Sequence, residues 1–352
     1  MKNRQKPLLQ KVIITLLLAA VLIGLLAILA YYQRPAGFTD SGLEAAVREK
    51  LDKPEGRILR YEMLGIAELD ASGFDIAALE GIERLANLQA LNLEDNFVED
   101  LSPLRSLSNL ASLNLRNNEI TDLQAVNFEA VTELPLRYLS LRHNVYRPET
   151  GEQARLSDIG LLGELSGLEN LELRDNRIED IAPLSRLHNL QILDLRENNF
   201  TDLAPLAELK RLRELNLRDN DLNDLTPLAA LTELTYLNIH SNKNAASLEP
   251  LAGLTKLEEL IMANVPVGGR LTVIADMTEL RRLNIRNCGI VDTAVLGDLM
   301  AGGALQDCTE RGIEAVVDIR LNPLPEEGFD PYGPIRPYWP NISERKPDEL
   351  PQ

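Results

Sequence analysis

The sequence predicts an α/β solenoid of leucine-rich repeats, and three observations carry that prediction. An Asn recurs every 22 residues in the central part of the chain, at Asn176, Asn198, Asn220 and Asn242. Each Asn closes the frame Leu-x-x-Leu-x-x-Leu-x-Leu/Ile-x-x-Asn, whose last apolar pair alternates as in a strand. Aromatic residues make up only 4% of the chain, as expected when aliphatic ladders fill a long core. Such units bury their leucines only against neighbouring units, so one elongated body is expected.

The N-terminal segment differs in composition from the repeats and is predicted to cross a membrane. An uncharged run of 21 residues from Val12 to Tyr32 follows four basic residues: Lys2, Arg4, Lys6 and Lys11. As a helix this run is about 31 Å long, which matches a hydrocarbon core of roughly 30 Å. The basic flank predicts that residues 1–11 are cytoplasmic and residues 12–32 form a signal-anchor. Everything beyond a linker at residues 33–39 is then extracytoplasmic.

A cleaved signal peptide is the alternative for the same segment, and the repeat region would then be secreted. The apolar run is longer than the usual core of a signal peptide. In addition, Tyr31 and Tyr32 resemble an interfacial aromatic anchor. We therefore favour the uncleaved form, and N-terminal sequencing of the mature protein decides between the two.

Charge and cysteine content exclude some classes of function. The whole chain has a formal charge of −18, and without the five basic residues of the first 34 it has 31 Lys and Arg against 54 Asp and Glu, a charge of −23. This charge opposes nucleic-acid binding and favours a soluble, monomeric repeat region. Cys288 and Cys308 are the only cysteines, and whether they pair is left open.

The ends of the array are expected to be capped, because an open solenoid exposes strand edges and core leucines. Residues 40–84 are predicted to form an N-terminal cap, with an amphipathic helix from Asp40 to Leu51, and a degenerate first repeat. Repeats then occupy residues 85–324, with a helix expected around 292–299. Residues 325–352 form a Pro-rich C-terminal cap and tail, of which the last dozen residues are expected to be disordered.

Two features of the repeats depart from the strict frame. The steps after Asn118 and Asn144 are longer, and the polar residues 145–158 are expected to leave the stack as a loop. Near the C-terminal end, Val265 falls in the Asn position unless Asn264 reaches it through a bulge. Both alternatives are kept.

The recurring Asn residues are predicted to be structural. Each turns the chain after its strand, and its amide can bond to backbone groups that the turn leaves without partners in the core. This ladder comprises Asn96, Asn118, Asn144, Asn176, Asn198, Asn220, Asn242 and Asn322. On the convex side the motif Asp-Leu/Ile-x-Pro-Leu recurs, where Pro is tolerated because no strand ladder needs its missing N–H.

The 22-residue unit Asn-x-Ile/Leu-x-Asp-Leu/Ile-x-Pro-Leu, as at residues 176–184, resembles the repeats of bacterial internalins. The helix around Leu43 to Arg48 is similar to the N-terminal cap of those surface proteins. The resemblance extends from about Asp40 to Pro325 and implies a non-enzymatic ligand-binding or adhesion role. The apparent N-terminal anchor and the absence of a Leu-Pro-x-Thr-Gly sorting motif depart from the family pattern.

One concave column of the predicted sheet is rich in arginine. The residue after the second inward position is Arg in seven of ten coils, in a chain that is otherwise acidic. The column reads Glu94, Arg116, Arg142, Arg174, Arg196, Arg218, His240, Ala263, Arg286 and Arg320.

Two interpretations of this column stay open. In the first, neighbouring acids neutralise the central arginines as exposed ion pairs, each worth only about 0 to 1 kcal/mol. The residues concerned are Glu172, Asp175, Asp194, Glu197 and Asp219 around Arg174, Arg196 and Arg218. In the second, arginines left unpaired at the ends of the run, chiefly Arg116 and Arg142, recognise a carboxylate-bearing peptide or protein. Charge reversal at both would then abolish ligand capture without lowering thermal stability.

The candidate ligand-binding residues on the concave face are Arg116, Tyr138, Arg142, Arg174, Arg196, Arg218, Tyr236, His240 and Arg286. No catalytic set is recognisable, since the three His lie in different coils and there is no Gly-rich phosphate loop, metal-ligand spacing or calcium loop. We therefore expect no enzyme activity, cofactor or metal. The sequence predicts an extracytoplasmic module that binds a protein at the cell surface, with a structural envelope scaffold as the alternative.

Overall fold

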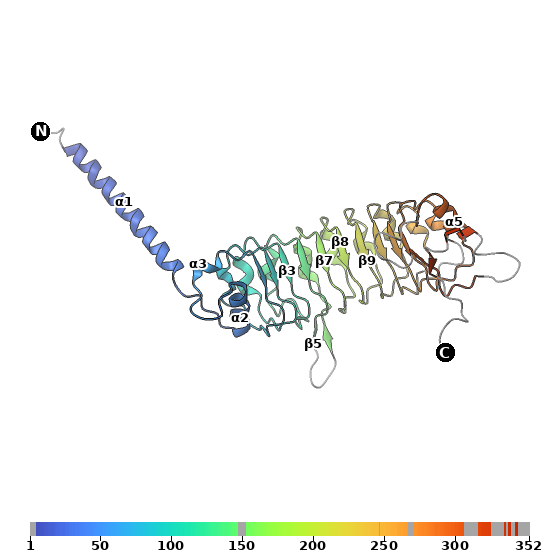
Figure 1. Ribbon diagram of the computed structural model, residues 1–352, viewed down its shortest axis with the longest axis horizontal. Coiled ribbons are helices and arrows are strands. Elements are labelled where there is room, and N and C mark those ends of the chain that lie inside the picture. The colour runs from blue at the N-terminus through green and yellow to red at the C-terminus, as the bar shows by residue number, and fades with distance from the viewer. Residues whose placement is uncertain are drawn as a thin grey trace.

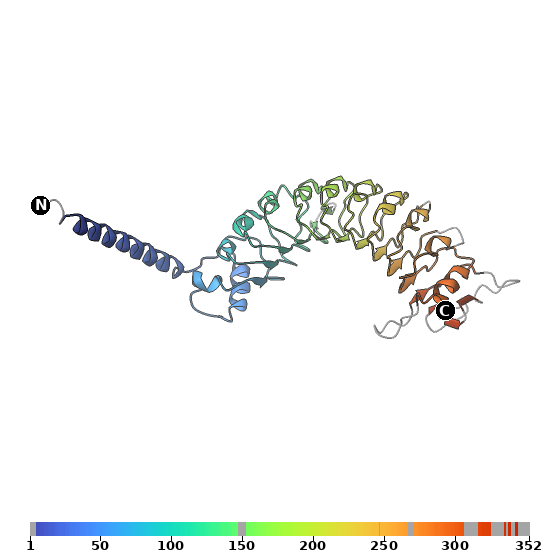
Figure 2. The same ribbon diagram turned by 90° about the horizontal axis from the view of Figure 1, so that it is seen from above.

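The protein is a curved solenoid with a long helix projecting from its N-terminal end (Figure 1). The computed structural model describes residues 5–146, 153–245, 247–266, 271–305, 316–324, 334–335, 337–338 and 342–343. Seen from above, the strands lie on the inner side of the arc and the short helices on its outer side (Figure 2). The predicted leucine-rich-repeat solenoid is confirmed.

A parallel sheet of twelve strands forms the concave face. Its strands, in spatial order, are β1 (Glu68–Asp70), β2 (Ala90–Asn92), β3 (Ser112–Asn114), β4 (Tyr138–Ser140), β7 (Asn170–Glu172), β8 (Ile192–Asp194), β9 (Glu214–Asn216), β10 (Tyr236–Asn238), β11 (Glu259–Ile261), β12 (Arg282–Asn284), β13 (Val317–Asp318) and β14 (Ile342–Ser343). The inward leucines align from strand to strand, as Leu91, Leu113 and Leu139 do. The same register places equivalent outward residues of successive coils side by side.

The convex face consists mainly of short 3-10 helices. These are η1 (Ile82–Arg84), η2 (Ser102–Ser106), η3 (Gly160–Glu164), η4 (Ala182–Arg186), η5 (Ala204–Leu206), η6 (Thr226–Ala230), η7 (Glu249–Leu251) and η8 (Thr272–Ile274), with the α-helical turn α4 (Glu129–Thr132) between η2 and η3. An Asp begins five of these turns, η2 to η6: for example, the Asp180 carboxylate accepts the Ala182 N–H at 2.8 Å, and Asp202 accepts that of Ala204 at 2.8 Å. In η2, η4, η5, η6 and η7, Pro is the second residue of the helix, where an N–H would have no intrahelical partner and its absence costs no bond.

The Asn ladder joins each of its coils to the neighbouring coils, and all of its members except the half-buried Asn322 are buried. The Asn198 amide donates to the carbonyl oxygens of Leu173 and Leu195, both at 3.0 Å, and accepts the Ile178 N–H at 3.1 Å. In two coils a residue other than Asn occupies the ladder position. Val265, aligned with Asn242 by the pairing of β10 and β11, is fully buried, so an apolar residue fills that position and no bulge is formed.

Cys288 fills the same position in the next coil. Its thiol is free and buried, and it donates to the Met262 carbonyl oxygen at 3.0 Å, as the Asn amides do. Burial raises the pKa of this thiol to about 11, so it stays protonated at neutral pH. Cys308 lies outside the described residues.

The residue before each ladder position adopts a left-handed backbone conformation, with φ between 52° and 62°. These residues are Asp95, Asn117, His143, Asp175, Glu197, Asp219, Ser241, Asn264, Asn287 and Leu321. Asp, Asn and His tolerate this conformation better than other side chains, which accounts for most of the choices at this position.

The N-terminal cap closes the first coil as expected. Helix α2 (Ser41–Lys50) buries Leu43, Ala46 and Val47. The Asp40 carboxylate caps it by accepting the N–H groups of Gly42 at 2.8 Å and Leu43 at 3.0 Å. Its other oxygen accepts two more from the first coil, Ala77 at 3.0 Å and Ala78 at 3.2 Å. One side chain thus holds the cap helix to the solenoid.

The projecting helix α1 spans Gln5–Tyr32, and its part Ile13–Tyr32 has the length and apolar composition to cross a membrane, with a mean hydropathy of 3.0. The segment 33–39, expected as a linker, is hydrogen-bonded to the cap. The Ala36 N–H donates to the Ile58 carbonyl oxygen at 2.7 Å, and the Arg60 N–H donates to that of Arg34 at 3.1 Å. Helix α3 (Arg60–Met63) contacts α1 at this junction.

At the other end, helix α5 (Ala294–Ala301) forms close to the predicted position. The chain then returns to cover the last coils: Ile335 is fully buried, and Pro334 packs closely on Gly297. Ile342–Ser343, inside the segment expected to be disordered, pair in parallel with β13 as β14. The structure therefore corrects that expectation for these two residues.

The insertion between β4 and β7 leaves the stack, as predicted, and forms a hairpin of β5 (Val145–Tyr146) and β6 (Ala154–Arg155). It projects from one lateral edge of the solenoid (Figure 1). Tyr146 on this hairpin is exposed.

Candidate binding surface on the concave face

The sheet brings the predicted ligand-binding residues onto one surface. Tyr138 and Tyr236 begin their strands, and the arginines lie in the column three to four residues further on, just beyond the strand ends. We call this second set the Arg column; it comprises Arg116, Arg142, Arg174, Arg196, Arg218, Arg286 and Arg320. Glu94 and His240 occupy the equivalent position in two other coils. Because neighbouring strands are about 4.8 Å apart, these residues lie side by side from coil to coil.

Six of the seven arginines form ion pairs within the chain. The pairs are Arg116 with Glu94, Arg142 with Glu172 at 3.4 Å, Arg174 with Glu197 at 2.8 Å, Arg196 with Asp194 at 2.6 Å, Arg218 with Asp219 at 2.7 Å and Arg320 with Asp318 at 2.6 Å. The hydrogen bond to Asp194 raises the pKa of Arg196 above its usual value. The arginines of the column and the acidic residues beside them therefore form a network of ion pairs.

This pairing corrects the expectation that Arg116 and Arg142 are unpaired. The Glu94 carboxylate binds Arg116 from the preceding coil, and it stands in the same column of the sequence. That pair was therefore visible in the repeat alignment. Glu172 pairs with Arg142 rather than with Arg174, because the 32-residue step between Asn144 and Asn176 still places β4 directly beside β7.

A polar hollow of about 170 Å³ lies on the concave side at the second to fourth regular coils, those of β3, β4 and β7. It is lined by Arg116, Arg142, His143, Arg174 and Asp175. Small-molecule sites usually have volumes of roughly 300 Å³ or more, so this hollow has the size for one anionic group rather than a whole ligand. Arginines from three consecutive coils therefore line it.

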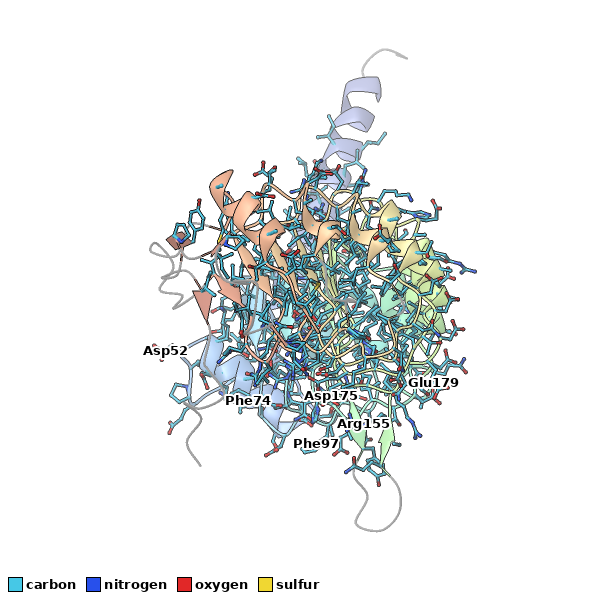
Figure 3. All side chains as sticks on the ribbon, turned by 90° about the vertical axis from the view of Figure 1, so that its right-hand side faces the viewer. Asp52, Phe74, Phe97, Arg155, Asp175 and Glu179 are labelled. Atoms are coloured by element: carbon cyan, nitrogen blue, oxygen red, sulfur yellow. The ribbon has the colours of Figure 1, made fainter. Side chains whose placement is uncertain are left out.

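Asp175 organises one side of the hollow. Its carboxylate binds both the His143 imidazole and the Arg155 guanidinium, the latter from the projecting hairpin. Burial acts to raise the pKa of Asp175, but these hydrogen bonds outweigh it and hold the pKa below its usual range. Figure 3 shows Arg155 and Asp175 close together near the base of the hairpin.

Tyr138 lies two columns away from the arginines of the hollow, beyond the column of Ser140, and stays protonated. Burial, followed by the negative charge of Glu172, raises the pKa of its hydroxyl to about 12. The phenol is therefore available as a hydrogen-bond donor at every physiological pH.

Tyr236, His240 and Arg286 occupy the concave face of the later coils. The Tyr236 hydroxyl accepts hydrogen bonds from the Asn216 and Asn238 amides, both at 3.3 Å. Burial and then the charge of Arg218 lower the pKa of His240, so its imidazole is neutral at pH 7. Arg286 is exposed and makes no ion pair within the described part of the chain.

Comparison with known proteins identifies the repeats and their relatives. The family model described as Leucine Rich repeats (2 copies) matches residues 86–129, 154–208 and 210–253. The crystal structure of internalin C2 (inlC2) from Listeria monocytogenes shares 32% identity, with a TM-score of 0.56 over 62% of this chain and 92% of that one. An internalin (inlF) of the same organism shares 26% identity, with a TM-score of 0.64 over 91% of this chain and 99% of that one. No curated protein sequence matches the chain.

The chain belongs to the internalin-like leucine-rich-repeat family. Its fold presents a long, open and curved surface, which is the geometry of a protein-binding module. Within the residues that the structure describes, no group of three or more His, Cys, Asp or Glu side chains is arranged to hold a metal ion.

Two residues of the hollow were missed as site residues at the sequence level. His143 and Asp175 hold the left-handed position of their coils, where the repeat pattern indicates a turn residue rather than a binding residue. Arg155 comes from the insertion, whose lack of repeat frame gives no indication of where its side chains fold. Gln153, Arg155 and Arg177 also line a larger hollow of about 460 Å³ beside the hairpin, with residues of the next coils.

Proposed function

We propose that this internalin-like chain is a membrane-anchored, extracytoplasmic module that binds another protein on its concave face. A carboxylate of the partner enters the hollow between Arg116, Arg142 and Arg174. The candidate residues Tyr138, Arg196, Arg218, Tyr236, His240 and Arg286 extend this contact along the sheet.

The observation that carries the proposal is that arginines from three consecutive coils line one hollow in a strongly acidic chain. Ion pairing leaves some N–H donors of these arginines unused, because each guanidinium has five of them. Arg142 uses one terminal nitrogen for Glu172, and its Nε–H has no partner in the described structure. The pairs fix the arginine side chains in place, so less conformational entropy is lost when a partner binds.

Site-specific photo-crosslinking tests the use of the concave face. A benzoylphenylalanine at Tyr236 is expected to give one saturable protein adduct in intact cells, whereas the same group at Ser185, on the exposed convex face, gives none. Adducts at both positions, or at neither, contradict the proposal. N-terminal sequencing and protease accessibility of the same protein test whether α1 is retained and whether the repeats face outward.

The role of the hollow is tested with the partner recovered in that adduct. Replacing Arg116, Arg142 and Arg174 by Lys keeps the charges but removes the planar fork that binds a carboxylate through two hydrogen bonds. Affinity is expected to fall about tenfold, corresponding to about 1.4 kcal/mol. Arg320→Lys, in the same column but outside the proposed contact, is the control and should keep the affinity within about twofold. An equal loss in both variants would contradict a carboxylate site at the hollow.

A structural envelope scaffold is the second candidate, and the ion-pair lattice favours it. Six of the seven column arginines already have an acidic partner in the chain, so their charges are neutralised without a ligand. The crosslinking experiment separates the two candidates, because a scaffold without a dedicated ligand gives no saturable concave adduct.

A further inference from the structure

The junction between α1 and the solenoid is an ordered part of the fold. Pro35 and Leu59 form an antiparallel bridge, flanked by the backbone hydrogen bonds of Ala36 with Ile58 and of Arg60 with Arg34. In addition, the Arg60 guanidinium lies over the Tyr31 ring, 4.4 Å from its centre. The last turn of α1 and helix α3 are thus held against each other.

This contact determines the depth of α3 relative to a bilayer that α1 spans. The apolar run ends at Tyr32, and the rings of Tyr31 and Tyr32 pack edge to face at 5.4 Å. Tyrosines at the end of a spanning helix lie at headgroup level. The polar layer on each side of the hydrocarbon core is roughly 5 to 7 Å thick, so a guanidinium stacked on Tyr31 lies within it.

The charges around this junction differ from those of the concave face. Arg34, Arg57 and Arg60 form no ion pair within the described residues. The acid of α3, Glu62, is already bound by Lys53 at 2.7 Å and accepts the Leu59 N–H at 2.6 Å. Beside these arginines, Tyr61 exposes 52% of its surface. Arginine binds phosphate through two hydrogen bonds, and an exposed tyrosine is favoured at the membrane interface.

We propose that Arg34, Arg57, Arg60 and Tyr61 form a second contact with the membrane, in which the N-terminal cap binds phospholipid headgroups of the leaflet that it faces. The guanidinium groups contact lipid phosphates, and Tyr61 inserts beside Tyr31 at headgroup depth. This inference rests on the part of the proposed function in which α1 spans the membrane. The solenoid extends away from the end of α1 in both views, so this contact is confined to the cap (Figures 1 and 2).

Depth-dependent fluorescence quenching in proteoliposomes of the full chain tests the contact. The only Trp of the chain, Trp339, is first replaced by Phe, and a single Trp is then introduced as Tyr61→Trp. The quencher is phosphatidylcholine with a nitroxide on its headgroup. We expect the reporter at position 61 to lose roughly half of its emission and to shift to shorter wavelength. Tyr146→Trp is the matched control: it places an equally exposed aromatic residue on the hairpin several coils away, where no quenching is expected.

A second variant separates headgroup binding from simple proximity. Replacing Arg34, Arg57 and Arg60 by Ser in the Tyr61→Trp protein should remove most of the quenching while the protein still floats with the vesicles. If a floating protein shows no more quenching at position 61 than at position 146, or if the triple variant is quenched equally, the headgroup contact is overturned and the anchor stands. A full chain that does not float with vesicles overturns the anchor, and the headgroup contact with it.

Discussion

In most coils a single buried Asn amide bonds to backbone groups of its own coil and of the preceding coil, and its removal should be costly. Asn198→Ala leaves the carbonyl oxygens of Leu173 and Leu195 and the Ile178 N–H without their partner in the core. Each unsatisfied buried group costs about 1 to 3 kcal/mol, so we expect the free energy of unfolding in urea to fall by about 3 kcal/mol. Asn199→Ala, at the exposed next position, should change it by less than about 0.5 kcal/mol. Similar losses in both variants would show that the ladder is not the cause.

Asp40 holds the cap helix and the first coil together and should make stability depend on pH. Burial acts to raise the pKa of Asp40, but hydrogen bonds from four backbone N–H groups outweigh it and lower the pKa below 3.8. Because the folded-state pKa is lowered, the stabilisation is complete above the unfolded pKa of about 3.9 and is lost as pH falls through the lowered value.

Asp40→Ala should therefore lower the free energy of unfolding at pH 7 by about 2 kcal/mol, the upper end for loss of an N-cap. The difference between this variant and the natural chain should shrink as the pH is lowered below about 4. Glu49→Ala, in the same helix but exposed, is the control and should have no such effect. A difference that stays constant down to pH 2 would mean that the carboxylate charge contributes nothing.

Among the elements, the C-terminal return segment is positioned by a close approach to α5. A Cβ added at Gly297 would lie 2.6 Å from the Pro334 Cβ and 2.7 Å from its carbonyl oxygen. Gly297→Ala should displace this segment, lower the free energy of unfolding by about 2 kcal/mol and speed hydrogen exchange in β13. At Gly302, the added Cβ would be 3.4 Å from the nearest atom, so Gly302→Ala should leave that exchange unchanged. Unchanged exchange in Gly297→Ala would show that the segment does not protect β13.

The elements also show which parts of the structure the sequence can predict. The strands, the inward leucines and the α2 cap follow from local periodicity and capping residues, because each coil repeats the same short sequence pattern. The pair of Arg116 with Glu94 is readable from the column, whereas the pair of Arg142 with Glu172 depends on the three-dimensional register across the insertion. Arg155 could not have been placed beside Asp175, since the hairpin that carries it lies outside the repeat frame.

For the whole molecule, the common register predicts that coils can be removed in complete units. Deleting residues 199–220 removes one 22-residue period and joins two coils that are already in the same register. The product should fold, with the denaturant m-value reduced by roughly a tenth because less surface is exposed on unfolding. Deleting residues 199–209, about half a period, should prevent cooperative unfolding altogether. Circular dichroism in urea measures both, and two folded products would contradict a register-based stack.

The ordered junction at residues 34–37 also has a mechanical consequence. A long solenoid fixed at one end acts as a lever, so a sideways force on its distal coils produces its largest torque at the fixed end. That load falls on the hydrogen bonds joining residues 34–36 to residues 58–60 and on the Arg60–Tyr31 stack. Tension on a bound partner would thus reach α1 as a twist and tilt of the helix, instead of being absorbed by a swivelling tether.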